Sequence, residues 1–350
     1  MNSLTEKLVA GRDLAPSEIN YAVTVLFSDT TDDSSKAEFL TALHRKGETA
    51  DEIFGFVENL VERAIDPMID PMKLAGPMID VCGTGGDGLD LFNVSTTIMF
   101  ILAAGGAVVV KHGNRSVTSA CGSADVLEEL GVRLDLSPED LRECLERHGL
   151  GFLFARQYHP AFRAIAEMRA RLARDKTRTI FNLLGPLLNP TRPARQLIGV
   201  YAPRLTGVFA EVMRRLGRER AWIVHGLTET GAGMDDISTS GPTTLAELQN
   251  GKITSGVLDP RWFGIKPSTV DELRGGDRVT NAETVRGLLA GELRGAKLDL
   301  ALVNAGGGFV VAGISPTIVE GIALAREQIE SGRALAKLRA LQDYGAKVSR

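Results

Sequence analysis

The sequence predicts an α/β protein, in which a small N-terminal helical domain precedes a larger domain with a mainly parallel sheet flanked by helices. Residues 1–73 carry apolar residues at helical spacing and show no alternating strand pattern. From residue 78 onward, short apolar strands alternate with helical segments, which is the order of parallel βαβ units. Glycine is frequent, at 38 residues, and aromatic residues make up only 5%, which favours an α/β enzyme with tight loops over a β-sandwich.

Helix-start signals occur throughout the first 73 residues. Three Ser or Thr residues are each followed three positions later by Glu, the pattern of a capping box: Ser3 with Glu6, Ser35 with Glu38, and Thr49 with Glu52. The proline-rich stretch 67–77 then breaks the helical pattern. We therefore predict domains of residues 1–73 and 74–350, and we allow helices near 160–190 to pack with the helical domain.

The elements after this boundary follow one another as a βαβ unit. Residues 78–82 are predicted to form a strand and residues 83–90 a glycine-rich loop. Asn93 is a suitable N-cap for a helix that ends at Ala104, and a β-branched strand follows at 107–110. The remaining predicted elements are three strands, at 196–201, 221–225 and 298–303, and one or two amphipathic surface helices at 317–341.

Composition excludes several classes of protein. A chain of 350 residues with 44% hydrophobic and 24% charged residues is long enough and apolar enough to bury a large core, so it is not globally disordered. A net charge of −4 and a pI near 5.9 argue against binding of nucleic acid by bulk electrostatics. The N-terminus lacks an apolar signal core, and the uncharged stretch 91–110 contains polar residues and a glycine pair. We expect no membrane partner.

The cysteines indicate the compartment. Cys82, Cys121 and Cys144 form no CxxC pair and are odd in number, which is typical of a protein in a reducing environment. We therefore expect a cytoplasmic protein.

A glycine-rich loop follows the first predicted strand. Residues 83–88, Gly-Thr-Gly-Gly-Asp-Gly, satisfy the GxGxxG pattern of dinucleotide-binding proteins, which is weak evidence by itself. Asp87 places a carboxylate beside the expected pyrophosphate, and the next strand ends in Lys111 where an NAD site needs an acid. An anionic ligand that arrives with a divalent cation fits this loop better. A tight strand-to-helix turn without a ligand is the alternative.

Polar residues gather at the start of the helix that follows. Asn93, Ser95, Thr96 and Thr97 supply an amide and hydroxyls where the free N–H groups of a helix N-terminus favour anions. An ordinary N-cap is the alternative, but the position ten residues after the glycine loop opens favours phosphate binding.

The strongest motif lies at the end of the second predicted strand, where α/β sheets bind their ligands. Residues 111–119, Lys-His-Gly-Asn-Arg-Ser-Val-Thr-Ser, are followed by Gly122 and Ser123. They bring two cations, an amide and several hydroxyls together with little bulk, which suits phosphate and ribose oxygens. A solvated loop does not need so many small residues around its charges.

Six segments together resemble the anthranilate phosphoribosyltransferases. They are GTGGDG (83–88), NVST (93–96), KHGNR with GSADVLEELGV (111–115 and 122–132), YHPAFR (158–163), RTIFNLLGPLLNP (178–190) and NAGGGFVVAG (304–313). The resemblance covers nearly the whole chain. It implies a helical domain packed on an α/β domain, as in pyrimidine nucleoside phosphorylases, and a homodimer formed through the helical domain.

The resemblance also implies the site residues. Phosphoribosyl pyrophosphate would be surrounded by residues from the first three of these segments and by Ser119 between 115 and 122. The residues are Gly83, Gly86, Asp87, Asn93, Val94, Ser95, Thr96, Lys111, His112, Gly113, Asn114, Arg115, Ser119 and Ser123. Anthranilate would be held by a smaller set: Gly83, Asn114 and Arg169, with His112 and His159 close by. Magnesium, the implied cofactor, would be bound by Ser95, Asp235 and Asp236.

Two positions depart from the family pattern. Asp236 stands where the family usually has Glu, which puts one magnesium contact in question. Leu91 stands where the family usually has Thr, which removes one hydroxyl. The segment 227–233 before the acidic pair is longer than is usual in the family.

The residue types support these roles, and each has a structural alternative. Arginine binds carboxylates in a bidentate manner, but Arg169 has arginine neighbours and also fits a solvated basic face. Asp235 and Asp236 follow a predicted strand through a loop, a usual place for hard oxygen ligands, although an acidic pair in a loop is more often surface. His112 and His159 each also fit a structural histidine, so no catalytic base is assigned.

The implied activity is that of a pentosyltransferase. The amine of anthranilate displaces pyrophosphate from C1 of phosphoribosyl pyrophosphate in a magnesium-dependent reaction, the second step of tryptophan synthesis from chorismate. A neutral arylamine is already a nucleophile, so the protein has to align the amine with C1 and stabilise the leaving group. Two alternatives remain: a pyrimidine nucleoside phosphorylase, and a non-catalytic relative that binds nucleic acid in a basic groove.

Overall fold

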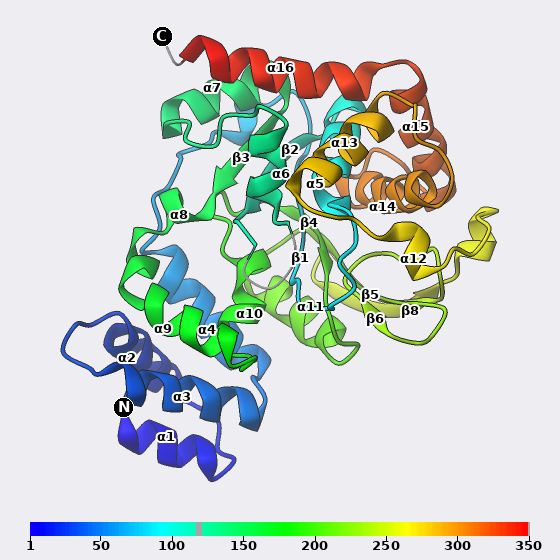
Figure 1. Cartoon of the computed structure of the whole chain (residues 1–350). Coiled ribbons are helices and arrows are strands. Elements are labelled where there is room, and N and C mark those ends of the chain that lie inside the picture. The colour runs from blue at the N-terminus through cyan, green and yellow to red at the C-terminus, as the bar shows by residue number, and fades with distance from the viewer. Residues whose placement is uncertain (117–120, 349–350) are drawn as a thin grey trace. The chain divides into compact units, whose positions relative to one another are not determined.

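The computed structural model describes residues 1–116 and 121–348, and the chain divides into two compact units (Figure 1). The helical unit contains residues 1–66 and 155–190, and the α/β unit contains residues 67–154 and 191–350. The predicted limits, 1–73 and 74–350, differ from this division because residues 155–190 group with the N-terminal helices. The reason is packing, since α9 contacts α3 and α10 contacts α4 within the helical unit.

The helical unit is built of helices and short 3-10 turns. Its elements are α1 Asn2–Val9, α2 Pro16–Leu26, α3 Asp33–Lys46, α4 Ala50–Val61, α8 Ala155–Tyr158, η2 Pro160–Ile165, α9 Ala166–Arg174, α10 Phe181–Leu184 and η3 Gly185–Leu187. The prediction that residues 1–73 contain helices and no strand is confirmed, and the short turn η1 (Pro71–Lys73) lies in the α/β unit.

Only one of the three predicted capping boxes forms. Thr49 Oγ1 accepts from the Glu52 N–H at 3.2 Å, and Glu52 accepts from the Thr49 N–H at 2.9 Å. The box at Ser3 is wrong because α1 already begins at Asn2. The box at Ser35 is wrong because Asp32 caps α3 instead and accepts from the Ser35 N–H at 2.9 Å. An aspartate three residues upstream is an equally good cap and starts the helix one turn earlier.

The α/β unit contains an eight-stranded sheet. Its strands are β1 Met78–Gly83, β2 Val108–Gly113, β3 Leu150–Phe154, β4 Arg195–Gly199, β5 Arg220–Leu227, β6 Gly233–Met234, β7 Thr243–Gln249 and β8 Lys252–Leu258. The order is β3-β2-β1-β4-β5-β7-β8, and β6 pairs with β5. The strands from β3 to β5 are parallel, whereas β6, β7 and β8 are antiparallel. The predicted mainly parallel sheet is therefore confirmed.

Helices cover the sheet. They are α5 Val94–Ala104, α6 Ser123–Glu129, α7 Pro138–His148, α11 Leu205–Arg215, η4 Pro260–Phe263, α12 Val270–Leu273, α13 Arg278–Leu289, α14 Ala296–Ala312, α15 Ile318–Glu330 and α16 Arg333–Val348. Of the one or two amphipathic helices predicted at 317–341, two are present, α15 and α16. Helices α5 and α14 pack against each other and against the parallel strands, and α14 and α15 lie side by side (Figure 1).

The predicted strand at 298–303 is wrong, because these residues belong to α14. This helix is buried almost all round, from Leu300 to Ala312, so its sequence is mostly apolar and shows no helical alternation of apolar and polar residues. A short apolar run does not distinguish a buried strand from a buried helix.

The uncharged stretch 91–110 forms helix α5, a turn and strand β2, as predicted. Nine residues of α5 are buried, so its apolar character comes from the protein core. Among the described residues, no helix is long and apolar enough to cross a membrane.

Strand order places the candidate site. The chain passes from β1 to β2 on one side of β1, and from β4 to β5 in the opposite direction. Between β1 and β4 the direction reverses, and α/β sheets bind ligands at the carboxyl ends of the strands beside such a reversal. The loop after β1 is the glycine-rich loop.

Candidate active site

The glycine-rich loop is attached to the end of β4. The Thr84 N–H donates to the Gly199 carbonyl at 2.9 Å, and the Tyr201 N–H donates to Thr84 Oγ1 at 3.1 Å. Two hydrogen bonds therefore hold the start of the glycine-rich loop against the end of β4, beside the point where the strand order reverses.

Asp235 packs into this loop. Its Oδ2 accepts from the Gly85 N–H at 2.7 Å, and a Cβ at Gly83 or Gly199 would collide with Asp235. Gly85 and Gly88 adopt φ angles of +67° and +76°, which L side chains rarely adopt. The glycines are needed here for close approach and for left-handed backbone, which a simple GxGxxG pattern does not reveal.

Three carboxylates gather beside the loop. The Asp235 N–H donates to Asp87 Oδ2 at 3.5 Å. Burial, followed by the Asp87 carboxylate, raises the pKa of Asp235 to about 7. Burial and the charges of Asp235 and Asp87 also raise the pKa of Asp236. Such a cluster of hard oxygen donors is stabilised by a divalent cation.

Magnesium fits this donor set because waters and substrate phosphates can complete its coordination shell. Within the described ranges, no group of three His, Cys, Asp or Glu side chains is arranged to hold a metal ion by itself. Mg²⁺ commonly takes one or two carboxylates and completes its shell with waters and substrate phosphates. The predicted metal residues Ser95, Asp235 and Asp236 do come together, because all three line one small cavity with Cys82 and Asn304.

Lys111 lies beneath this cavity. Its Nζ donates to the Val81 carbonyl at 2.7 Å and to Ser95 Oγ at 3.0 Å, and the side chain is buried. Burial lowers the pKa of Lys111, whereas the nearby Asp80 carboxylate opposes that shift. The ammonium group thus orients the Ser95 hydroxyl from inside the protein.

The start of α5 faces the same loop region. Asn93 precedes the helix as predicted, but its side chain makes no cap and donates instead to the Cys121 carbonyl at 3.2 Å. Val94 and Thr96 are buried, so they contribute backbone rather than side chain to a ligand. The first N–H groups of a helix lack intrahelical acceptors and form an anion site.

The segment after β2 is tightly packed. The His112 N–H donates to Asp80 Oδ1 at 3.3 Å, and Asn114 Oδ1 accepts from the Arg115 N–H at 2.8 Å. Arg115 pairs with Asp125 at 3.0 Å and Glu128 at 2.8 Å, so carboxylates already neutralise its charge. Its predicted contact with phosphate stays a prediction.

The other predicted residues of this segment stand as follows. A Cβ at Gly113 would lie 2.7 Å from the Phe152 ring, so this position requires glycine. Ser123 is the first residue of α6, and Gly86 adopts a φ of +79° in the glycine-rich loop. Ser119 lies outside the described residues.

Arg169 lies over two neighbouring aromatic rings in the helical unit. Its guanidinium carbon lies 5.0 Å from the ring centre of Phe181 and 5.4 Å from that of Phe162. It makes no hydrogen bond or ion pair with any residue that the structure describes. Burial lowers its pKa to about 10, so it remains a cation at neutral pH without a counter-ion. Such a group is suited to an anionic ligand such as a carboxylate.

The alternative of a solvated basic face does not hold for Arg169. Arg163, Arg171 and Arg174 are exposed, whereas Arg169 is partly buried over the two rings. Its environment is therefore different from that of its neighbours on the same stretch.

His159 is a neutral group at physiological pH. It is 4% exposed, and burial lowers its pKa to about 4, although a backbone hydrogen bond with Leu188 opposes the shift. It therefore supplies no charge for an anionic substrate.

We expect this histidine to make the protein acid-sensitive. Between pH 6.5 and 4 the unfolded chain binds a proton at His159 that the folded chain does not, so stability falls as pH falls. From the two pKa values the loss is about 3 kcal/mol. The measurement is urea unfolding of wild type and His159→Asn at pH 7 and pH 4.5. Equal losses in both proteins would contradict the prediction.

The predicted anthranilate residues are divided between the two units. Arg169 and His159 belong to the helical unit, whereas Gly83, His112 and Asn114 belong to the α/β unit. That these residues act on one substrate stays a prediction.

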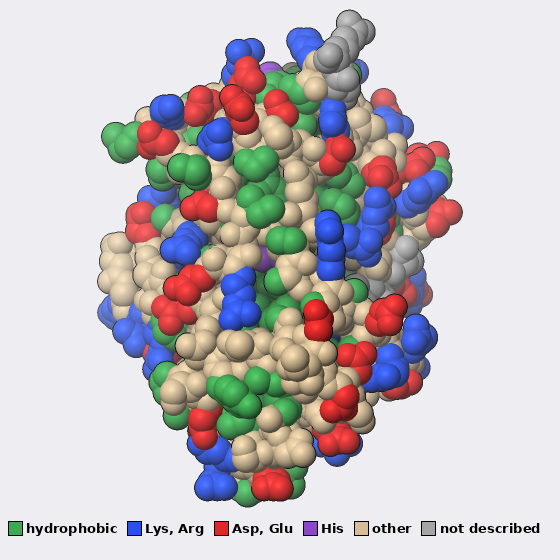
Figure 2. All heavy atoms as spheres, turned by 90° about the vertical axis from the view of Figure 1, so that its left-hand side faces the viewer, with side chains coloured by type: hydrophobic (Ala, Val, Ile, Leu, Met, Phe, Trp, Pro, Cys, Tyr) green, Lys and Arg blue, Asp and Glu red, His purple; other side chains and the backbone are tan. Residues whose placement is uncertain are grey.

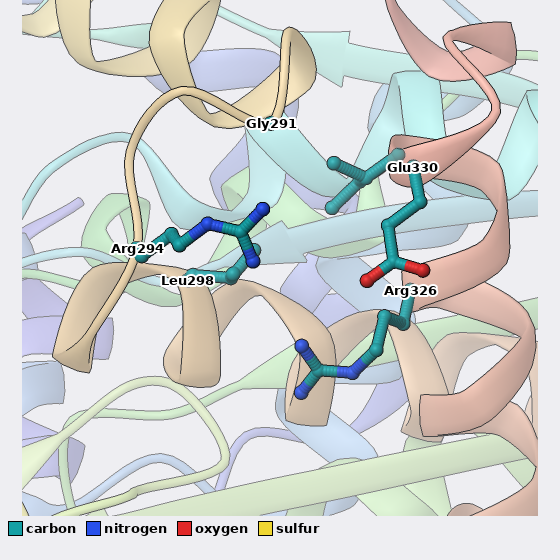
Figure 3. Close-up of a pocket in the computed structure, with 6 residues that line it drawn as sticks. Gly291, Arg294, Leu298, Arg326 and Glu330 are labelled. Carbon is teal, nitrogen blue, oxygen red and sulfur yellow. The ribbon is translucent and has the colours of Figure 1, made fainter.

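A second hollow lies elsewhere in the α/β unit (Figure 3). Arg294, Arg326 and Glu330 extend around it, and Leu298 forms part of its wall. It contains none of the predicted site residues, so we do not assign the reaction to it.

On the face shown in Figure 2, acidic and basic side chains are interspersed.

Sequence reasoning did not assign two residues of this site. Gly199 lies within the strand predicted at 196–201 and ends the observed strand β4, so the rule that ligands bind at strand ends pointed to this region. Asn304 belongs to the motif 304–313, but only the tertiary structure shows that it contacts Ile237, the residue after Asp236.

Comparisons with known proteins identify the family of the chain. Residues 75–335 match the a/b domain of a glycosyl transferase family, and residues 2–64 match its helical bundle domain. The chain is 41% identical over 335 residues to an anthranilate phosphoribosyltransferase of Chlorobaculum parvum, covering 96% of this chain and 93% of that protein. It is 42% identical over 345 residues to one of Pelotomaculum thermopropionicum, covering 98% and 96%.

Solved structures show the same similarity. The crystal structure of anthranilate phosphoribosyltransferase from Thermus thermophilus superimposes with a TM-score of 0.88 at 38% identity, covering 98% of this chain and 99% of that chain. The enzyme from Saccharomyces cerevisiae in complex with PRPP and Mg superimposes with a TM-score of 0.85 at 25% identity, covering 99% and 97%.

Proposed function

Because the chain belongs to the glycosyl transferase family, and within it to the anthranilate phosphoribosyltransferases, we propose that it transfers the phosphoribosyl group of phosphoribosyl pyrophosphate to the amine of anthranilate. The C1–O bond to pyrophosphate breaks, the C1–N bond forms, and the amine loses one proton. The product is the N-phosphoribosyl derivative of anthranilate, and pyrophosphate is released.

The observation that carries the proposal is the joining of the glycine loop to the acidic cluster by the 2.7 Å bond between Gly85 and Asp235. It places backbone N–H groups for phosphate oxygens next to carboxylates for a cation, which is what a pyrophosphate–magnesium pair requires. A nicotinamide dinucleotide does not require such carboxylates.

Each group has a defined task in this proposal. Ser95, Asp235 and Asp236 would hold Mg²⁺, which would supply positive charge for the departing pyrophosphate. The N-terminus of α5 attracts the phosphates, and Lys111 keeps the Ser95 hydroxyl oriented. Arg169 binds the carboxylate of anthranilate and so orients its amine. The protein needs no strong base, because the arylamine is neutral.

The test is the loss of anthranilate fluorescence with purified protein. We expect the loss to require both phosphoribosyl pyrophosphate and Mg²⁺. Thymidine with phosphate serves as the control reaction, because a nucleoside phosphorylase of the same fold would convert it. Turnover of thymidine without turnover of anthranilate would overturn the proposal.

The proposal includes a homodimer formed through the helical unit. The support for this dimer is the resemblance to the family; in the same unit, the apolar side chains of Val9 and Tyr21 are 76% and 54% exposed. We expect light scattering at micromolar concentration to give twice the mass of the 37.5 kDa chain. A monomer mass would contradict this. The cytoplasmic location stays a prediction.

A further inference from the structure

We propose that Asn304 is a positioning residue for the acidic pair, which it holds in a metal-binding conformation through the backbone of Ile237. The inference rests on the proposed function, because it assumes that Asp235 and Asp236 serve Mg²⁺. Asn304 lies on α14, far along the chain from the residues that it would orient.

The side chain of Asn304 is fully engaged. Its Oδ1 accepts from the Ile237 N–H at 2.9 Å, and its Nδ2 donates to the carbonyls of Ile237 and Leu300, each at 2.9 Å. The residue is 1% exposed. Both backbone groups of Ile237, the residue after Asp236, are thus bound to one amide, which fixes the peptide planes on both sides of Ile237.

The glycines that follow Asn304 let the helix come this close. A Cβ at Gly307 would lie 2.5 Å from Ile237 Cδ1, and one at Gly308 would lie 2.9 Å from the Leu102 side chain. Residues three apart share one face of a helix, so Asn304 and Gly307 meet Ile237 together. Residues 304–308 therefore form the packing surface for Ile237 and so support the loop that carries Asp235 and Asp236.

The position of Asn304 points to metal binding rather than to general packing. It lines the same cavity as Ser95, Asp235 and Asp236. Mutually repelling carboxylates tend to separate, and a fixed backbone keeps them close enough to share one cation. Without the hydrogen bonds between Asn304 and Ile237, the loop that carries Asp235 and Asp236 would become ordered only when Mg²⁺ binds.

Asn281 provides a matched control in the same unit. It is 2% exposed, donates to the Gly276 carbonyl at 2.9 Å and accepts from the Gly276 N–H at 3.3 Å. It is thus a second buried asparagine that clamps both backbone groups of one residue, but it does not line the acidic cavity.

The experiment compares Asn304→Ala with Asn281→Ala. Binding of Mn²⁺ together with pyrophosphate is measured by electron paramagnetic resonance, and activity is measured over a Mg²⁺ titration. We expect both variants to melt at a lower temperature. Only Asn304→Ala should bind Mn²⁺ about tenfold more weakly and need correspondingly more Mg²⁺ for half-maximal activity, with kcat recovering at high Mg²⁺.

Wild-type Mn²⁺ binding in Asn304→Ala, or equal weakening in both variants, would overturn the inference. If Asn304→Ala does not fold, Asn304→Ser replaces it, since its short side chain also cannot bridge to Ile237. A wild-type protein that converts anthranilate while Asn304 variants keep normal metal binding would refute only this inference. A wild-type protein that does not convert anthranilate would refute the proposed function.

Discussion

Arg169→Ala should raise the KM for anthranilate tenfold or more and change the KM for phosphoribosyl pyrophosphate much less. The guanidinium lies over the rings of Phe162 and Phe181 without a carboxylate partner in the described chain. A hydrogen-bonded pair with the substrate carboxylate contributes about 1.5–3 kcal/mol. Steady-state kinetics with each substrate varied in turn provides the measurement.

Arg171→Ala is the matched control for this experiment. Arg171 lies on the same helix but is exposed, so its removal should leave both KM values close to those of wild type. Arg169→Lys keeps the charge and loses the bidentate geometry, so it should fall between wild type and Arg169→Ala. An unchanged anthranilate KM in Arg169→Ala would refute the assignment.

Replacing both Asp235 and Asp236 by alanine should lower kcat about a hundredfold and raise the Mg²⁺ concentration needed for half-maximal activity. The two carboxylates lie with Ser95 around one cavity beside the glycine loop. Magnesium cannot be held near the departing pyrophosphate when both are gone. The measurement is activity across a magnesium titration.

The single variants should differ. Asp235→Ala also breaks the bond to Gly85 and so disturbs the loop, whereas Asp236 has a shorter side chain than the usual glutamate and should contact the metal through a water. Asp236→Ala should therefore be the milder change. Asp271→Ala removes an exposed acid that pairs with exposed Arg274, and it serves as control. A flat titration in the double variant would mean that neither aspartate serves the metal.

Local sequence signals were sufficient to predict the elements that depend only on neighbouring residues. Strand β1, the glycine loop, helix α5 and strand β2 follow one another within 78–113, and each carries its own signal of apolar run, glycine or cap. The likeness of the motif segments to a known family added the candidate ligands. These features depend on neighbouring residues, which the sequence displays directly.

The tertiary structure decided what depends on distant partners. Residues 155–190 joined the helical unit because their apolar faces pack on α3 and α4, and 298–303 became part of a buried helix because it is covered on every side. Arg115 acquired two carboxylate partners, and Arg169 acquired none among the described residues.

What the sequence by itself determined is the chemistry of the candidate site, since glycines, hydroxyls, cations and acids are visible in order along the chain. Only the tertiary structure decided how they meet: Asp235 against Gly85 across 150 positions, and Asn304 against Ile237 across 67. The physical reason is that these contacts form where strand ends and a glycine-faced helix converge, and such convergence follows from strand order and helix packing rather than from any local pattern.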